Sequence, residues 1–205
     1  MSLYVLAEKT GFLASMFGQS AGLVELHTIQ HPRVGECIAL FLSPVDAAIC
    51  VQYLNRQPHE GRKNDYEIRI HSDPTVTASV RALGAMKQMY ASLVCGFATC
   101  AKGKLVVVGG VFSLAHTPLL ATDMNWIFGN ASKPQPDVIT STYASLAHYG
   151  AADHAEDIDK LDLLEPVAIH KIAEIALAQI GAMTSGQSDG LSIYSPIRQA
   201  WRRLA

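Results

Sequence analysis

The feature that most constrains the fold is a continuous apolar run, CIALFL, over residues 37–42. A run without polar interruptions is typical of a strand that is covered on both faces. A helix start follows it at once. Ser43 can cap the helix, Pro44 suits the first helical position, and Asp46 lies where the helix dipole favours a carboxylate. The sequence therefore predicts a buried strand that leads directly into a helix.

That helix is expected to continue to Asn55 and to carry an apolar stripe. Val45, Ile49 and Tyr53 are spaced four residues apart, so they share one face. We expect this face to pack against the sheet, with Ile49 in the core.

The remaining segments alternate between strand and helix patterns. Residues 66–71, YEIRIH, alternate apolar and polar side chains, which is typical of a half-exposed strand. Further strands are expected over residues 3–7 and 23–29, a hairpin over 90–114, and helices from 74, over 138–149 and over 166–180. Trp201, with Arg198, Arg202 and Arg203, is expected to anchor a helical tail.

Strands dominate the first 115 residues and helices dominate the last 70. These patterns predict an α+β fold, with a mixed or antiparallel sheet built mainly from residues 1–115, flanking helices and a helical C-terminal part. We expect residues 1–205 to form a single domain. The alternative is a sheet-containing part, residues 1–129, joined to a helical part, residues 137–205, by the Pro-rich segment NASKPQPD.

Charge and hydropathy exclude two classes of protein. Charged residues make up 17% of the chain, hydrophobic residues make up 49%, and the net charge is −2. Disorder requires low hydrophobicity with high net charge, and nucleic-acid binding by bulk charge requires a basic surface. The scarcity of charge also leaves apolar surface to be covered, so we expect a homodimer, a protein partner, or both.

No segment has the pattern of a secretion signal or of a membrane span. The first residues lack a basic region followed by an apolar core, and the uncharged stretch 105–122 contains glycines and Pro118. The four cysteines form no C-x-x-C pair and no disulfide framework. We expect a cytoplasmic protein with reduced thiols that binds neither membranes nor nucleic acids.

Two glycine-rich patterns suggest a site, and neither has the required context. Residues 18–22, GQSAG, match the G-x-S-x-G nucleophile elbow, but a strand pattern follows where the elbow requires a helix. The glycines at 103, 109 and 110 match no phosphate-binding motif. We expect Ser20 to lie in a turn and no nucleotide to bind.

Eight histidines raise the question of metal binding. Only His148 and His154, with Asp153 and Asp157 nearby, are close enough in sequence to suggest a local ligand set. Their spacing matches no metal-binding signature. We expect a polar loop here, with no metal and no cofactor.

The most distinctive charge feature is the acidic segment, residues 153–165, which has the sequence DHAEDIDKLDLLE. Such a segment can steer a basic partner by long-range attraction. We expect Asp153, Glu156, Asp157 and Asp159 to be exposed and to bind a basic protein. A solvated helix start without a binding role is the alternative.

Two functional classes remain. The first is a non-catalytic protein-binding domain: a subunit, an adaptor or a neutralising partner of another protein. The second is a small cytoplasmic enzyme, for example a hydrolase, with scattered site residues. Its first candidates are His116, Asp123 and Asn125, which follow an apolar hairpin and lie beside Trp126. We favour the binding class, because no catalytic motif has the context that it needs.

Overall fold

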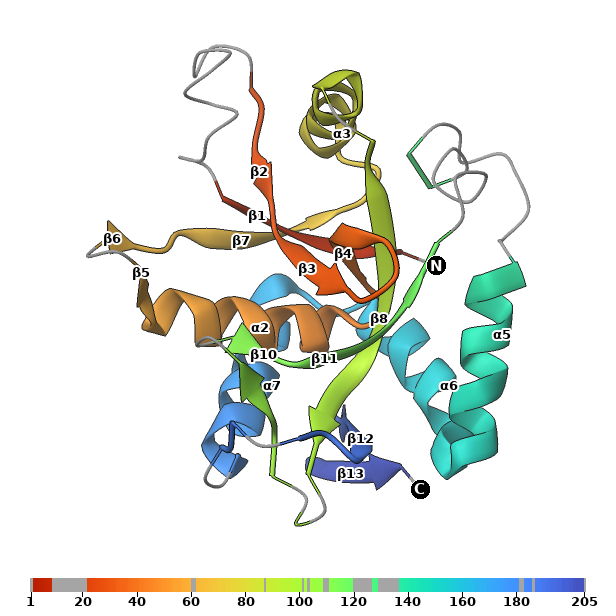
Figure 1. Cartoon of the computed structure of the whole chain (residues 1–205). Helices are drawn as coiled ribbons and strands as arrows, with labels where there is room; N and C mark the ends of the chain where they lie inside the picture. The colour runs from red at the N-terminus through yellow and green to blue at the C-terminus, as the bar shows by residue number, and fades with distance from the viewer. Residues whose placement is uncertain are drawn as a thin grey trace.

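The computed structural model describes residues 2–8, 22–59, 62–86, 88–100, 102, 104–108, 111–119, 127–128, 137–180, 183–185 and 187–204. One sheet of nine strands runs through the molecule, with helices on both faces (Figure 1). Its strands are β1 (Tyr4–Glu8), β2 (Glu25–Leu26), β3 (Thr28–His31), β4 (Gly35–Phe41), β7 (Tyr66–Ile70), β8 (Tyr90–Thr99), β11 (Leu114–Pro118), β12 (Gly190–Ser195) and β13 (Ala200–Leu204).

The helices follow the strands in an irregular alternation. They are α2 (Pro44–Arg56), α3 (Pro74–Met86), α5 (Asp137–Leu146), the π-helical turn η2 (Ala147–Ala151), α6 (Ala152–Leu161) and α7 (Pro166–Gln179). Two short ladders lie outside the main sheet: β5 (Pro58–His59) with β6 (Arg62–Lys63), and β9 (Val107–Val108) with β10 (Val111–Phe112). None of the helices that the structure describes is long and apolar enough to cross a membrane.

The sheet is mixed, in the order β13-β12-β8-β4-β1-β2, with β11 on β8, β3 on β4 and β7 on β1. β4 and β8 run parallel, with Phe41 opposite Val94. The other neighbouring pairs of this sheet are antiparallel. The predicted α+β fold with a mixed sheet and flanking helices is confirmed.

Alternate residues of the strands face two separate cores, because successive side chains of a strand point to opposite faces. Phe41 and Val94 belong to the core formed with α2 and α7. Leu40 and Leu93 belong to the core formed with α3, α5 and α6. Each face of the sheet is therefore covered by its own set of helices.

The junction of β4 and α2 is formed as the sequence predicts. The Oγ of Ser43 accepts the backbone N–H of Asp46 at 3.3 Å, and Pro44 is the first helical residue. Ten of the thirteen residues of α2 are buried, including Ile49. The helix is more deeply enclosed than one apolar stripe predicts, because α7 covers the side that faces away from the sheet.

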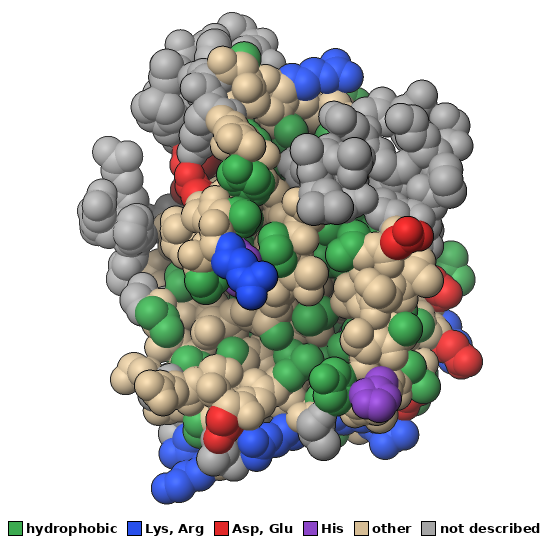
Figure 2. Space-filling model, turned by 45° about the vertical axis from the view of Figure 1, so that its right-hand side comes forward, with side chains coloured by type: hydrophobic (Ala, Val, Ile, Leu, Met, Phe, Trp, Pro, Cys, Tyr) green, Lys and Arg blue, Asp and Glu red, His purple; other side chains and the backbone are tan. Residues whose placement is uncertain are grey.

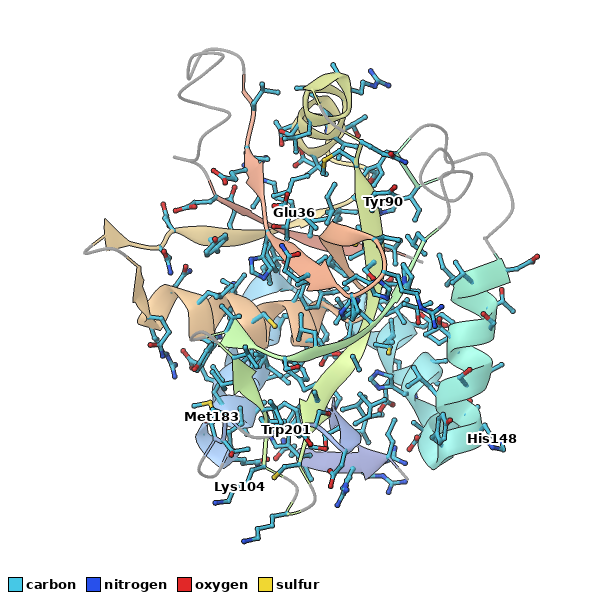
Figure 3. The ribbon with its side chains drawn as sticks, in the orientation of Figure 1. Glu36, Tyr90, Lys104, His148, Met183 and Trp201 are labelled. Atoms are coloured by element: carbon cyan, nitrogen blue, oxygen red, sulfur yellow. The ribbon has the colours of Figure 1, made fainter. Side chains whose placement is uncertain are left out.

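The C-terminal tail is a β-hairpin, so the predicted helical tail is wrong. β12 and β13 pair with each other, and Ser192 of β12 lies opposite Phe97 of β8. The indole N–H of Trp201 donates to the carbonyl of Ala176 at 3.0 Å, and its ring packs edge-on against Phe97 (Figure 3). Tertiary pairing with β8 thus determines the conformation of the tail.

The predicted hairpin over residues 90–114 is only partly correct. β8 does pair with a following antiparallel strand, but that strand is β11, and it begins at Leu114. Leu105, expected to begin the return strand, makes a single bridge with Thr99.

Replacing Ile49 by Asp is expected to unfold the protein. The side chain is fully buried, and an unpaired buried charge costs several kcal/mol, out of a total stability of roughly 5–15 kcal/mol for a typical domain. Thermal unfolding followed by circular dichroism checks this. Ala144→Asp, at an exposed position of α5, is the control and should leave the Tm nearly unchanged. An Ile49→Asp protein with the wild-type Tm would contradict the packing of α2.

A second substitution tests the docking of the C-terminal hairpin. Gly96 has a φ of +150°, and a Cβ there would lie 2.8 Å from both the carbonyl oxygen of Ser192 and Cδ1 of Leu191. We expect Gly96→Ala to lower the free energy of unfolding by about 2 kcal/mol or more. Gly84→Ala, in α3, meets no atom within 4 Å and should be neutral or stabilising by up to about 1 kcal/mol. Urea unfolding that gives equal stabilities for both variants would exclude this close approach.

Candidate functional site

β7 lies at the margin of the sheet, beside α2 (Figure 1). Among the described strands it pairs with β1 alone. The backbone N–H of His71 donates to the carbonyl of Leu3, whereas the carbonyl of Leu6 accepts from His27 on the other side of β1. Pairing groups alternate along an antiparallel strand, so the N–H and C=O groups of Tyr66, Ile68 and Ile70 point away from β1. One edge of the sheet is therefore open.

Both ends of this edge are already hydrogen-bonded. The side chain of Asn55 accepts the N–H of Tyr66 and donates to its carbonyl, both at 2.9 Å, as a neighbouring strand would. At the other end the carbonyl of Ile70 accepts the N–H of Asp73 at 2.9 Å. Within the described part of the chain, the N–H and C=O of Ile68 and the N–H of Ile70 have no partner. These three groups form the free edge.

A groove of about 790 Å³ runs beside the free edge, and we call it the β7 groove. α2, β7, α7 and the connection between α6 and α7 form its walls. Its lining is largely apolar and consists of Tyr4, Pro44, Val51, Gln52, Asn55, Arg56, Tyr66, Glu67, Ile68, Arg69, Ile70, Leu161, Asp162, Leu164, Pro166, Ile169, His170 and Glu174. The shape and the lining suit a bound apolar segment.

Two polar contacts hold the walls of the β7 groove together. The hydroxyl of Tyr4 donates to Oδ1 of Asp162 at 2.6 Å, which ties β1 to the end of α6. The amide of Gln52 donates to the carbonyl of His170 at 2.7 Å, which ties α2 to α7. Burial, followed by the contact with Asp162, raises the pKa of Tyr4 well above its ordinary range. The phenol therefore remains a neutral hydrogen-bond donor that supports the wall.

Exposed aliphatic side chains line the β7 groove or lie next to its lining residues in the chain. Leu163 and Val167 are 85% and 80% exposed, and Leu164 and Ile70 are 42% and 45% exposed. A second hollow, of about 220 Å³, shares Leu161 and Leu164 with the groove and reaches Ile197, which is also exposed. Leu161 and Leu164 therefore connect the β7 groove with the second hollow.

The acidic segment does not form the continuous exposed surface that was expected. Asp153 pairs with Arg202 at 2.6 Å and with Arg198 at 3.2 Å. Asp157 is buried, with its Oδ2 3.5 Å from the hydroxyl of Ser195. The prediction that Asp157 is exposed is therefore wrong.

Glu156 and Asp159 of the acidic segment are exposed, as predicted. On the face shown in Figure 2, the acidic side chains are separate from one another. Two of the three C-terminal arginines thus pair with Asp153, and the third, Arg203, pairs with Asp189 at 3.3 Å.

The enzyme candidates are not assembled among the described residues. His116 lies on β11, and its Nδ1 is 2.8 Å from the hydroxyl of Ser92, whose side chain is fully buried. Burial and the neighbouring ring of His31 lower the pKa of His116. Asp123 and Asn125 lie outside the described residues, as do Ser20 and the glycines at 103, 109 and 110.

The two histidines of the suggested metal site lie in different environments. His148, in η2, is exposed (Figure 3), whereas His154, in α6, is buried. Burial lowers the pKa of His154 to about 4. In the described part of the chain, no three His, Cys, Asp or Glu side chains are placed to hold a metal ion.

The buried carboxyl of Asp46, at the start of α2, lies close to the thiols of Cys50 and Cys95. Burial raises the pKa of Asp46 to about 7, and its Oδ1 has no hydrogen-bond partner among the described residues. Burial and the adjacent Asp46 raise the pKa of Cys50 well above its ordinary range, and that of Cys95 to about 11. Protonated thiols are poor nucleophiles, so this cluster is suited to packing rather than to chemistry.

Asp46 makes stability depend on pH in a defined direction. Its folded-state pKa is raised, so between about pH 4 and about pH 7 the folded chain keeps a proton that the unfolded chain has lost. Stability contributed by this proton is present at low pH and is lost as the pH rises to about 7, with a limiting slope of about 1.4 kcal/mol per pH unit.

Asp46→Asn keeps the shape of the neutral acid without its titration. We expect the variant to gain stability relative to wild type on going from about pH 5 to about pH 8, as measured by urea unfolding at both values. An identical difference between the two proteins at both pH values would show that Asp46 does not titrate in this way.

No protein-family model matches this chain, and no curated protein or solved structure is significantly similar to it.

Proposed function

We propose that this chain is a non-catalytic protein-binding domain that receives an apolar segment of a partner protein in the β7 groove. The observation that carries the proposal is the set of exposed aliphatic side chains around the groove. Leu164 and Ile70 line this largely apolar hollow and are 42% and 45% exposed, and Leu163 and Val167, next to lining residues in the chain, are 85% and 80% exposed. Contiguous apolar surface next to a concavity is typical of an interaction site.

The size of the hollow suits several side chains of a partner. Fully burying one Val, Leu or Ile side chain contributes about 1.5–3 kcal/mol. Burial of Leu164, Ile70 and two or three side chains of the partner therefore favours binding, and the loss of rotational and translational freedom opposes it.

The charge around β7 favours a basic partner. The β7 groove and a second hollow, which also contacts β7, are together lined by four carboxylates and two guanidinium groups: Glu67, Asp73, Asp162 and Glu174, with Arg56 and Arg69. The proposal thus keeps the basic protein partner expected from the sequence, but it moves the binding surface from Asp153 at the start of the acidic segment to Asp162 near its end.

A peptide selection with matched variants tests this function. Random peptides displayed on phage would be selected against the full chain, and the affinity of the selected peptides would be measured by fluorescence anisotropy. We expect Leu164→Asp to weaken binding at least about tenfold, because it places a charge on the apolar wall. Val108→Asp is the control, since Val108 is 60% exposed and lies outside the groove lining.

Peptides that bind both variants equally well would contradict the proposal. The same conclusion would follow if the selection enriched no peptide that binds the wild-type chain.

A further inference from the structure

We infer that the bound segment adds to the sheet as an extra strand on β7, an inference that rests on the proposed function. The free edge offers the N–H and C=O of Ile68 and the N–H of Ile70 on the side away from β1. An extended segment pairs with such groups through its own backbone, and its side chains then alternate between the two faces of the sheet.

The hydrogen-bonded ends limit how far the added strand can pair. Asn55 already occupies both backbone groups of Tyr66, and the N–H of Asp73 occupies the carbonyl of Ile70. Only the three groups between these points are free among the described residues. The paired part of the partner is therefore short, about three residues, and most of its affinity must come from side chains.

The two faces of β7 select different side chains. Ile68 packs with the core formed by α2 and α7, so a partner residue directly opposite it points its side chain into the apolar β7 groove. The next partner residue points to the other face, where Glu67, Asp73 and Arg69 line a hollow of about 520 Å³. Two carboxylates and one guanidinium group line this hollow, and Arg69 pairs with both carboxylates.

The partner is therefore an extended segment with apolar side chains at alternate positions and a basic side chain between them. This pattern follows from the free backbone groups, the apolar groove and the charge of the opposite hollow taken together.

A second copy of β7 fits the free edge less well than a different segment does. A two-fold pairing centred on Ile68 would place Ile70 opposite Tyr66, whose groups are bonded to Asn55, so only two hydrogen bonds would form. A pairing centred on Arg69 would place two guanidinium groups directly opposite each other, which is destabilising. The added strand is therefore a segment of another protein.

An N-methyl scan of the tightest selected peptide tests strand addition. N-methylation blocks a backbone donor and adds bulk on the side where that donor points. Within the paired part of about three residues, we expect at least about tenfold loss of affinity at the one position whose N–H donates to the carbonyl of Ile68, and little change at its two neighbours, whose N–H groups face away from β7. A scan in which no position is more sensitive than both of its neighbours would overturn strand addition. In that case, continued sensitivity to Leu164→Asp would show that the groove still binds protein.

A variant of β7 provides an independent measurement. Ile68→Pro removes the outward N–H at a position where an edge strand tolerates proline, and Ile68→Ala is the control that loses the side chain but keeps the N–H. We expect Ile68→Pro to bind the peptide at least about tenfold more weakly than Ile68→Ala, and equal affinities would overturn the proposal. If Ile68→Pro does not fold, the N-methyl scan decides the question.

Analytical ultracentrifugation of the wild-type chain tests the alternative, in which a second copy of the chain occupies the free edge. A dimer that Ile68→Pro abolishes, in a protein whose selected peptides do not compete with dimer formation, would assign the edge to a second copy and overturn the inference.

Discussion

The burial of α2 between the sheet and α7 is the interaction on which the rest of the structure depends. Its buried residues complete the core beneath β4 and β8, and Tyr53 stacks on Phe112 with the ring centroids 4.1 Å apart. The polar residues of the same helix have a second role. Gln52 donates a hydrogen bond to α7, and Asn55 occupies the backbone groups at one end of the β7 edge. One helix therefore supplies much of the core on one face of the sheet and two residues of the candidate binding surface.

The elements that local physics determines could be predicted from the sequence, and those that depend on distant partners could not. The apolar run before Ser43 and the cap at its end are local signals, so the junction of β4 and α2 was predictable. The segment that forms β12 is short, and its ladder with β8 joins Ser192 to Phe97, far apart in the chain. No periodicity in the tail reports such a partner, and the spacing of Arg198 and Arg202 suggested a helix instead.

The candidate site was hidden for a related reason. Its lining comes from four separate parts of the chain, and the alternation of residues 66–71 predicts a strand without showing that one edge of it is open. One local signal was present: Leu163, Leu164 and Val167 interrupt a charged stretch, where a solvated surface has no need of them. The acidic segment is not uniformly exposed, because some of its charges have separate partners. Asp153 meets two arginines of the C-terminal hairpin, and Asp162 meets Tyr4.

The paired contact between Asn55 and Tyr66 has a consequence for how the protein behaves at high concentration. Edge strands recruit further strands, and proteins with long flat edges grow into open-ended assemblies. Here the side-chain amide of Asn55 makes the two hydrogen bonds with Tyr66 that an added strand would make, and it presents no further strand edge for pairing. The stretch of backbone left open on β7 is then limited to three groups, which bounds how far any further strand can pair there. The same side chain thus favours the capture of one short segment, as proposed, over continued growth of the sheet at this edge.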